Sequence, residues 1–437
     1  MIYLLFIGML ILFFVSFFLF QKNILNPSVI LCSVFLVSLF FTILNIKNWE
    51  IKLHSNTVLL ILETVIAFIL GNGMIYLLPR KYKTFSEFKN ENIEIKVPSF
   101  KIMLIINIIL SILLYKYFRE IYKLSLIGGN PGGYNLMLFY AREAQLKFNN
   151  VNRVLTYAIY FVKSISYVCL FILSYNSIYK KFKIKNLVLV TPTLIYLGFI
   201  ILSTGRTEFI YLLVFILVMF FTLYQQKYSF DSKLTKKIII YGILILLLFF
   251  VIFSLVGLLT GKTQSRSIFE MISIYVGSSI PALDIYINSP IIPNTYFGEN
   301  TLIPFYKILR VLGYEKGPLI YPASEFLFFG GIATNIYTAI RKYYQDFGIV
   351  GLNLITFLLG CFYGIFFHYS SYKKNNFFCM ILYSNLCYPI FMFVIEDLFL
   401  TGFFPTGIIY NFVALGVTYY LLVYKNRKKQ KIKEEFK

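Results

Sequence analysis

The sequence predicts an all-α, polytopic integral membrane protein with about eleven transmembrane helices and two long outward-facing loops that contain interfacial helices. Of its 437 residues, 59% are hydrophobic and only 14% are charged, whereas about 25% of the residues of a soluble domain are charged. Long apolar runs recur from one end of the chain to the other, so the bilayer acts as its solvent. We therefore expect a single transmembrane domain over residues 1–437.

A spanning helix needs about 20 mostly apolar residues. The first apolar run has no basic segment before it and no small-residue cleavage site, so we interpret it as a retained helix rather than a signal peptide. The predicted spans, in chain order, are 2–20, 29–46, 58–78, 102–117, 155–178, 186–203, 207–224, 238–259, 349–369, 377–395 and 404–424.

Two of the connecting segments are long, at 118–153 and 260–348. Both contain amphipathic or apolar stretches that Gly, Pro, Ser or charged residues interrupt, as is typical of interfacial or re-entrant segments. We expect such segments at 135–148, 268–287, 318–332 and 335–346.

The distribution of Lys and Arg predicts that the N-terminus lies outside and the C-terminus inside. Most of the 41 Lys and Arg residues lie in segments that this orientation places in the cytoplasm, including the basic tail at 425–437. The short outer loops hold only Lys47, Lys52 and Arg206, and short loops decide orientation. Both long loops then face the periplasm or the cell exterior.

The net charge of +22 is explained by the basic residues that flank membrane helices, so we predict no nucleic-acid partner. The sequence has no P-loop, no dinucleotide-binding loop, no HExxH and no GxSxG motif, and no DxD-type pair that would hold a metal and a sugar nucleotide. We predict neither a metal site nor a cofactor. The cysteines fall within apolar runs without metal-ligand spacing and are interpreted as small buried hydrophobes: Cys32, Cys169, Cys361, Cys379 and Cys387.

Charged residues within spans are functional hypotheses because burying a charge in the bilayer is costly. Glu63 and Lys163 either form structural contacts, such as an ion pair, or provide a polar floor beneath an outward-facing site. Arg206 follows Gly205 in a tight loop at the start of a span. It either anchors the helix at the interface or binds an anion such as a pyrophosphate, because helix N-terminal amides favour anions.

The segment 335–351 has the densest set of functional side chains in the chain, namely Arg341, Lys342, Tyr344 and Asp346. Lys342 and Asp346 are four residues apart and therefore share a helical face. Gly348 and Gly351 would permit a break and close packing. The alternative interpretation is ordinary helix capping with interfacial anchors. Further outer cations are Arg142, Arg153, Arg266 and Arg310, and the outer carboxylates include Glu143, Glu208, Glu270, Asp284, Glu325, Glu396 and Asp397.

Three motifs make the chain similar to the O-antigen and capsule oligosaccharide repeat-unit polymerases (Wzy type). They are S-T-G-R-T-E at 203–208, N-x-Y-T-x-x-x-x-x-Y-x-D-F-G-x-x-G at 335–351 and Y-A-R-E-A at 140–144. The resemblance implies transfer of a growing glycan from undecaprenyl pyrophosphate to the non-reducing end of a new lipid-linked repeat unit. It implies an enzyme of the bacterial inner membrane, a glycosyltransferase that has a lipid-linked oligosaccharide as its substrate and a flippase and a chain-length regulator as possible partners.

On this interpretation outer arginines bind pyrophosphate and stabilise the leaving group, and a carboxylate deprotonates the attacking hydroxyl. We assign the base to Glu325 and a positioning role to Asp346, because nearby Lys342 would make Asp346 the weaker base. Of the two histidines, His54 lies in a short outer loop and His368 at the cytoplasmic end of a span, and neither is assigned a role. The predicted catalytic residues are Arg206, Glu325, Arg341 and Asp346, and the predicted substrate-binding residues are Arg142, Arg266, Tyr337, Lys342 and Tyr344.

Three other classes of protein stay open. A flippase or transporter of lipid-linked oligosaccharide would usually show repeated halves and discontinuous midplane helices, and the sequence has no internal repeat. A lipid-linked glycan ligase, or another membrane glycosyltransferase that uses a polyprenyl-phosphate sugar, would share the outward-facing cations. A non-enzymatic membrane subunit would not need them.

The predicted orientation can be tested with reporter fusions. Fusions after Lys237 and after Lys437 should report the cytoplasm, and fusions near Pro293 should report the exterior, because the short basic loops fix the topology. A cytoplasmic signal at Pro293 would remove the basis for an outward-facing site.

Overall fold

The structure is a computed structural model of the whole chain. It describes residues 1–78, 95–134, 136–147, 151–180, 183–203, 205, 207–228, 240, 267–290, 294–314, 316–318, 326–371, 376–404 and 406–425. Several predicted features lie outside the described residues: Arg206, Arg266, Glu325, the span at 238–259 apart from Ile240, and the tail after Lys425.

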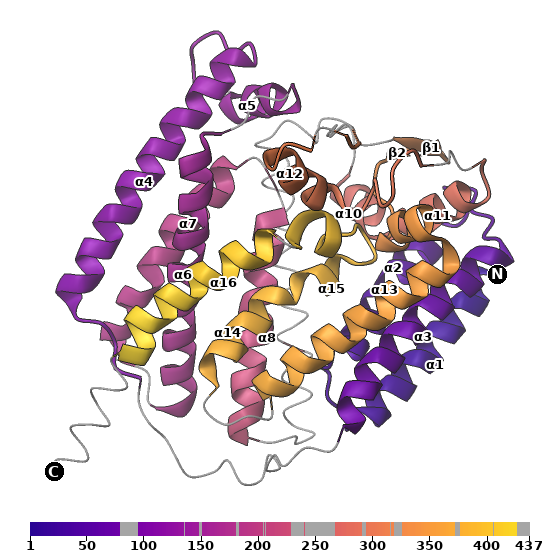
Figure 1. Cartoon of the computed structure of the whole chain (residues 1–437), viewed down its shortest axis with the longest axis horizontal. Coiled ribbons are helices and arrows are strands. Elements are labelled where there is room, and N and C mark those ends of the chain that lie inside the picture. The colour runs from indigo at the N-terminus through magenta and orange to yellow at the C-terminus, as the bar shows by residue number, and fades with distance from the viewer. Residues whose placement is uncertain are drawn as a thin grey trace. The chain divides into compact units, whose positions relative to one another are not determined.

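Nine helical segments of the described residues are long and apolar enough to cross a membrane. This confirms the predicted fold class, an all-α polytopic membrane protein (Figure 1). The segments are α1 (Ile2–Leu19), α2 (Pro27–Leu44), α3 (Ser55–Leu77), α4 (Phe100–Ile127), α6 (Arg153–Tyr179), η2 with α7 (Ile184–Val190 and Thr191–Leu202), α8 (Thr207–Tyr228), α13 (Ala339–Ser371) and α16 with η4 (Thr406–Tyr419 and Tyr420–Tyr424).

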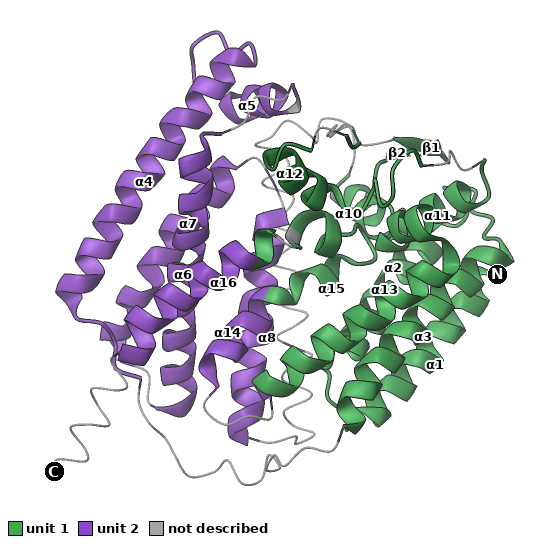
Figure 2. Ribbon diagram, viewed as in Figure 1, with its two compact units in different colours: residues 1–82, 266–370, 386–408 green, residues 83–265, 371–385, 409–437 purple. Residues whose placement is uncertain are grey.

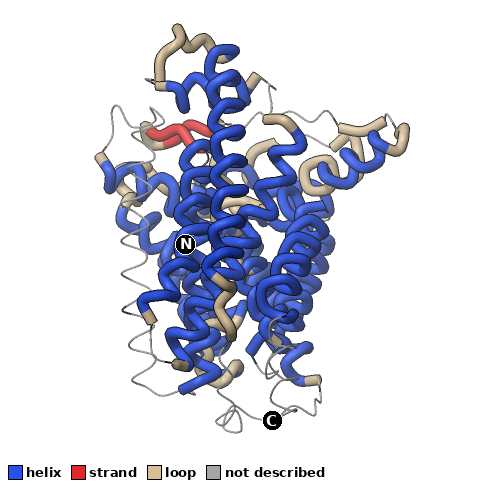
Figure 3. The backbone as a smooth tube through the Cα atoms, turned by 90° about the vertical axis from the view of Figure 1, so that its left-hand side faces the viewer, coloured by secondary structure: helices blue, strands red, loops and turns tan. Residues whose placement is uncertain are grey.

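The remaining elements are short, and Figure 3 shows how few strands the described residues contain. The two strands form one antiparallel hairpin, in which Leu327 pairs with Thr334 and Phe329 pairs with Ile332. The short elements are α5 (Met137–Leu146), α10 (Ile268–Gly277), α11 (Ser279–Ile287), α12 (Ile303–Val311), β1 (Leu327–Phe329), β2 (Ile332–Thr334), α14 (Phe377–Leu386), α15 (Tyr388–Met392) and η3 (Phe399–Phe403).

The structure corrects some predicted boundaries in the first half of the chain. Helix α4 continues to Ile127, ten residues beyond the predicted end of the fourth span, so the first long loop begins later than 118. The charged residues after 117 lower the hydropathy but do not stop a helix, and Glu120 and Lys123 form an i,i+3 ion pair of 3.9 Å on it.

The second half of the chain differs from prediction in two further places. The predicted tenth span, 377–395, is divided into α14 and the short α15, because Pro389 cannot continue a regular helix from the preceding residues. In the stretch 318–332, the described residues 327–329 form β1 instead of an interfacial helix, and the hairpin continues to Thr334. Helix α13 begins at Ala339 rather than at 335.

The chain divides into two compact units, which Figure 2 colours separately. Each unit contains membrane-spanning helices, and each is described by itself. Unit 1 consists of residues 1–82, 266–370 and 386–408, and unit 2 of residues 83–265, 371–385 and 409–437.

In unit 1, helices α3 and α13 pack with their backbones in close approach. A Cβ atom on Gly360 would lie 2.2 Å from the carbonyl oxygen of Phe68, and a Cβ on Gly71 would lie 2.0 Å from that of Phe357. Neither distance is possible for a real side chain, so glycine at both positions allows the two helices to touch. This contact fixes α13 against the N-terminal helices.

The segment that contains α10, α11 and the hairpin packs on one end of α2 and α3 (Figure 1). The Thr42 hydroxyl of α2 donates a hydrogen bond to the carbonyl of Gly277 at 2.8 Å. Trp49, in the turn between α2 and α3, forms a small buried cluster with Ile274 and Ile332. Polar and apolar contacts therefore hold the second long connecting segment at that end of the helices.

Helix α13 is interrupted at Gly348, as the sequence predicted. This residue has φ 64° and ψ −167° inside an otherwise helical segment, a backbone conformation that is open essentially to glycine alone. The break separates a first part, which carries Arg341 to Asp346, from the apolar part that packs on α3.

Gly348→Ala should therefore lower the free energy of unfolding by about 1–3 kcal/mol, because alanine is strained in this conformation. Thermal unfolding of the purified protein in detergent would measure the loss. The control is Gly73→Ala in α3, where an added Cβ meets no atom within 4 Å and φ is not positive, so stability should be unchanged or slightly higher. Equal stability of the two variants would contradict the break at Gly348.

Candidate active site

The centre of the candidate site in unit 1 is an arginine held between two tyrosine rings. Arg341 lies in the first turn of α13, and its guanidinium carbon is 4.4 Å from the ring centroid of Tyr286 in α11 and 4.0 Å from that of Tyr337. Only 8% of Arg341 is exposed. Stacking on a ring face stabilises a cation by about 0.5–2 kcal/mol and orients the planar fork. Burial raises the pKa of Tyr286 against the opposing effect of Arg341, so its hydroxyl stays protonated at neutral pH.

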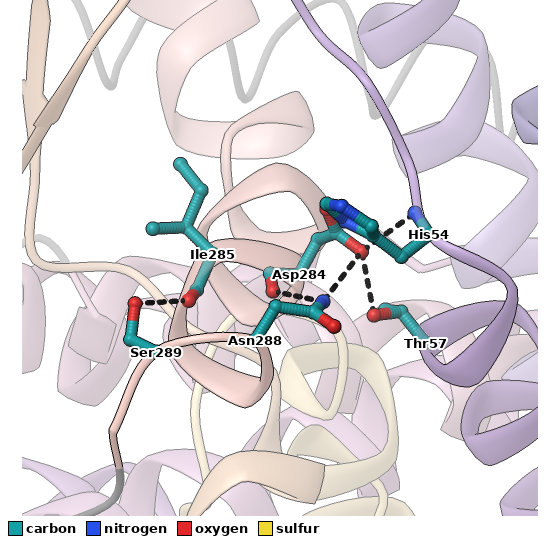
Figure 4. Close-up of polar contacts among 6 residues, drawn as sticks. All are labelled: His54, Thr57, Asp284, Ile285, Asn288 and Ser289. Carbon is teal, nitrogen blue, oxygen red and sulfur yellow. Dashed lines mark hydrogen bonds and ion pairs between the residues drawn. The ribbon is translucent and has the colours of Figure 1, made fainter.

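A second polar group lies on the same helix α11, two residues before Tyr286 (Figure 4). The Asp284 carboxylate accepts hydrogen bonds from the backbone N–H of His54 at 2.9 Å and from the Thr57 hydroxyl at 2.6 Å. Its other oxygen lies 2.8 Å from His54 Nδ1. The Asp284 side chain is 3% exposed and that of His54 is 59% exposed. A buried carboxylate thus orients an exposed imidazole.

Asp346 holds a connecting segment against the start of α13. Its carboxylate accepts hydrogen bonds from the side-chain amides of Asn294 at 2.7 Å and Asn300 at 2.8 Å. It also accepts them from the backbone N–H of Asn300 at 3.1 Å and from the N–H and hydroxyl of Thr301 at 2.8 and 2.6 Å. Every donor comes from residues 294–301, so Asp346 holds this segment against the first part of α13.

The two residues after Arg341 bind the segment before α16. Lys342 forms an ion pair of 3.3 Å with Glu396. The Tyr343 hydroxyl donates to the buried Asp397 at 2.7 Å, which also accepts from the backbone N–H groups of Phe399, Leu400 and Thr401. Burial raises the pKa of Asp397, and the bond from Tyr343 opposes this rise.

Five of the predicted site residues lie at the start of α13 or just before it, namely Tyr337, Arg341, Lys342, Tyr344 and Asp346. Of these, Arg341 stacks on Tyr337, whereas Lys342 and Asp346 bind other segments. Tyr344 lines an open depression of about 480 Å³ beside the Gly348 break. Arg142 lies half-buried in α5 of unit 2. Arg206, Arg266 and Glu325 lie outside the described residues.

In unit 2, Lys163 is paired with Glu208 rather than with Glu63. Lys163 Nζ lies 3.9 Å from Glu208 and 5.1 Å from the ring centroid of Tyr211. The Tyr196 hydroxyl donates to the same carboxylate at 3.0 Å. Glu208, the last residue of the S-T-G-R-T-E motif, therefore connects α6, α7 and α8. Glu63 lies on an exposed face of α3.

Sequence reasoning missed the pairing of His54 with Asp284 and the stacking of Tyr286 on Arg341. His54 and Asp284 are 230 positions apart, and no local spacing connects them. The sequence predicts only that both residues lie in outward-facing segments, and this is the one signal that relates them. Within the described part of the chain, no cluster of three His, Cys, Asp or Glu side chains could hold a metal ion.

Among curated proteins, an O-antigen polymerase of Shigella dysenteriae is 28% identical to this chain over 207 residues. The predicted resemblance to the O-antigen polymerase family is confirmed. The match covers 46% of this chain and 48% of that protein, so the chain spans about half the length of the curated O-antigen polymerase that it matches. No protein-family model matches the chain, and no solved structure matches it.

Asp346→Asn should release the segment 294–301, because an amide replaces one acceptor oxygen with a donor that faces other donors. A loss of about 1–3 kcal/mol in local stability is expected for donors left unsatisfied. Hydrogen–deuterium exchange of residues 294–301 would report it as faster exchange. The matched control is Glu396→Gln, which removes a half-exposed ion pair of about 0–1 kcal/mol. Unchanged exchange in Asp346→Asn would show that another contact orders the segment.

Proposed function

We propose that the protein is a repeat-unit polymerase of the bacterial inner membrane. In the proposed reaction the hydroxyl oxygen at the non-reducing end of a lipid-linked repeat unit attacks the anomeric carbon of the growing glycan. The bond from this carbon to undecaprenyl pyrophosphate breaks, and the pyrophosphate leaves with the electron pair. The observation that carries the proposal is the 28% identity to an O-antigen polymerase over about half the chain.

The site described in unit 1 is chemically suited to this reaction. Leaving-group departure creates negative charge on the pyrophosphate, and preorganised cations stabilise such charge best where water is excluded. Arg341 is buried and fixed by two rings, so its orientation does not change as the reaction proceeds. Tyr344 lines an open depression and is suited to contact a sugar ring, whereas Tyr337 is buried and acts by stacking on Arg341. We propose that Lys342 supplies a further cation here, and that Arg142, Arg206 and Arg266 also bind pyrophosphate in the course of the reaction.

The proposed orientation places the site at the outer face of the membrane, where lipid-linked units arrive after translocation. Long glycan chains would then be exported without crossing the bilayer again. A flippase and a chain-length regulator are the proposed partners, and no cofactor is required, because the lipid pyrophosphate bond is itself the activated donor.

Deletion of the gene in its own host, followed by complementation, would test the proposal. Wild-type protein should restore long glycan chains, whereas Arg206→Ala should give single repeat units at normal protein abundance. Arg206→Lys should rescue poorly because an ammonium group lacks the bidentate fork. The control is Lys185→Ala, which removes an exposed cation from η2 of the same unit and should polymerise normally.

The distribution of intermediates separates polymerisation from transport. A polymerase deletion leaves single lipid-linked units at the outer face, whereas loss of a flippase traps them at the cytoplasmic face. Trapping in the deletion strain would contradict the proposed function. Full chain length with Arg206→Ala would show that Arg206 only anchors its helix.

A further inference from the structure

His54 occupies an unusual position for a residue at the start of a membrane-spanning helix. It is the residue before α3, and its ring lies between a buried carboxylate and open surroundings. Asp284 contacts Nδ1 at 2.8 Å, while the His54 side chain is 59% exposed. An ionised carboxylate accepts a hydrogen bond from Nδ1–H, and in this tautomer Nε2 of a neutral imidazole carries the lone pair that can accept a proton.

The structural contacts of this position do not need the imidazole. Asp284 already joins α11 to α3 through the backbone N–H of His54 and the hydroxyl of Thr57, which is fully buried. Both bonds would persist with any side chain other than proline at position 54. The ring therefore adds little to the connection between the helices, and its orientation by Asp284 calls for another explanation.

The arrangement is that of a general base. Bases in proteins are commonly imidazoles whose second nitrogen is held by a carboxylate, which fixes the tautomer and stabilises the imidazolium that forms. His54 has the carboxylate, the exposure and the oriented ring. Asp346, by contrast, has both oxygens occupied by donors from Asn294, Asn300 and Thr301, so it is poorly placed to accept a substrate proton.

His54 and the proposed pyrophosphate-binding residue Arg341 both contact the short helix α11. Asp284 and Tyr286 are two residues apart on α11, so the His54 ring and the Arg341 guanidinium contact different sides of the same short helix. An α-helix with its side chains is about 10–12 Å across. Two substrates at this helix could therefore meet both groups, with the hydroxyl of the acceptor unit at His54 and the pyrophosphate of the donor glycan at Arg341.

We propose that His54 is the general base of the glycan transfer and that Asp284 is its positioning residue; this rests on the function proposed above. His54 Nε2 takes the proton of the acceptor hydroxyl as the hydroxyl oxygen bonds to the anomeric carbon. The carbon–oxygen bond to the lipid pyrophosphate breaks, and its electron pair leaves with the pyrophosphate. The imidazolium then returns its proton to water.

The test uses the full-length protein in liposomes with lipid-linked repeat units extracted from its host. His54→Ala should fold normally, because the Asp284 contacts to the backbone and to Thr57 remain, and should lower the turnover rate by about 10²–10⁴-fold. Added imidazole should restore part of the rate in proportion to its concentration. His54→Gln, whose amide can still donate to Asp284, should also be folded and slow.

Two comparisons identify the role of each residue. Arg206→Ala should be slow and unresponsive to imidazole, which excludes a general effect of the additive. Asp284→Asn should slow the wild-type protein more than it slows His54→Ala, because residues that act as one unit are non-additive. The effect that persists in the His54→Ala background measures the separate role of Asp284 in joining α11 to α3.

The possible results are decisive. Full activity of His54→Ala, or a loss of activity that imidazole does not restore, would overturn the assignment of His54 while wild-type turnover still supported a polymerase. Additive effects of the two substitutions would overturn the role of Asp284. Absence of turnover by the wild-type protein would instead contradict the proposed function itself.

Discussion

The buried carboxylate of Asp284 is the interaction on which the candidate site depends. It joins α11 to the start of α3 through two strong donors, and α11 carries the ring on which Arg341 stacks. A carboxylate that is 3% exposed is tolerated only when it is well hydrogen-bonded, because the cost of removing it from water is several kcal/mol. The surrounding donors offset that cost and also fix the position of the helix.

The start of α13 is held in a similar way, with successive residues bound to different parts of unit 1. Arg341 stacks on α11, Lys342 pairs with Glu396 and Tyr343 donates to Asp397. Because side chains of consecutive helical residues point about 100° apart, these contacts surround the first turn. Because α13 is broken at Gly348, the direction of this first turn is independent of the part of α13 that packs on α3.

Hydropathy predicted most of the spans because lipid contact demands long apolar helices, whatever their neighbours. Hydropathy did not predict the end of α4, because the helix continues to Ile127 through charged residues that lower the hydropathy. It also did not predict the β1–β2 hairpin, whose conformation depends on tertiary contacts such as the packing beside Trp49. The local cluster at 337–346 was visible in the sequence because its members are close in the chain. The pairing of His54 with Asp284 was not, because only the fold brings them together.

The carboxylates of unit 1 that accept several hydrogen bonds are of two kinds. Asp346 and Asp397 accept bonds chiefly from the backbone and side chains of a segment that they order, and each therefore acts as a connector. Asp284 also orders a helix start, but one of its oxygens faces a ring whose other edge is open. If Asp284 only held the two helices together, its second oxygen would not need the exposed His54 ring, because a water molecule could donate the same hydrogen bond. The side chain of His54 is therefore the part of this network that is most directly explained by chemistry on a bound substrate.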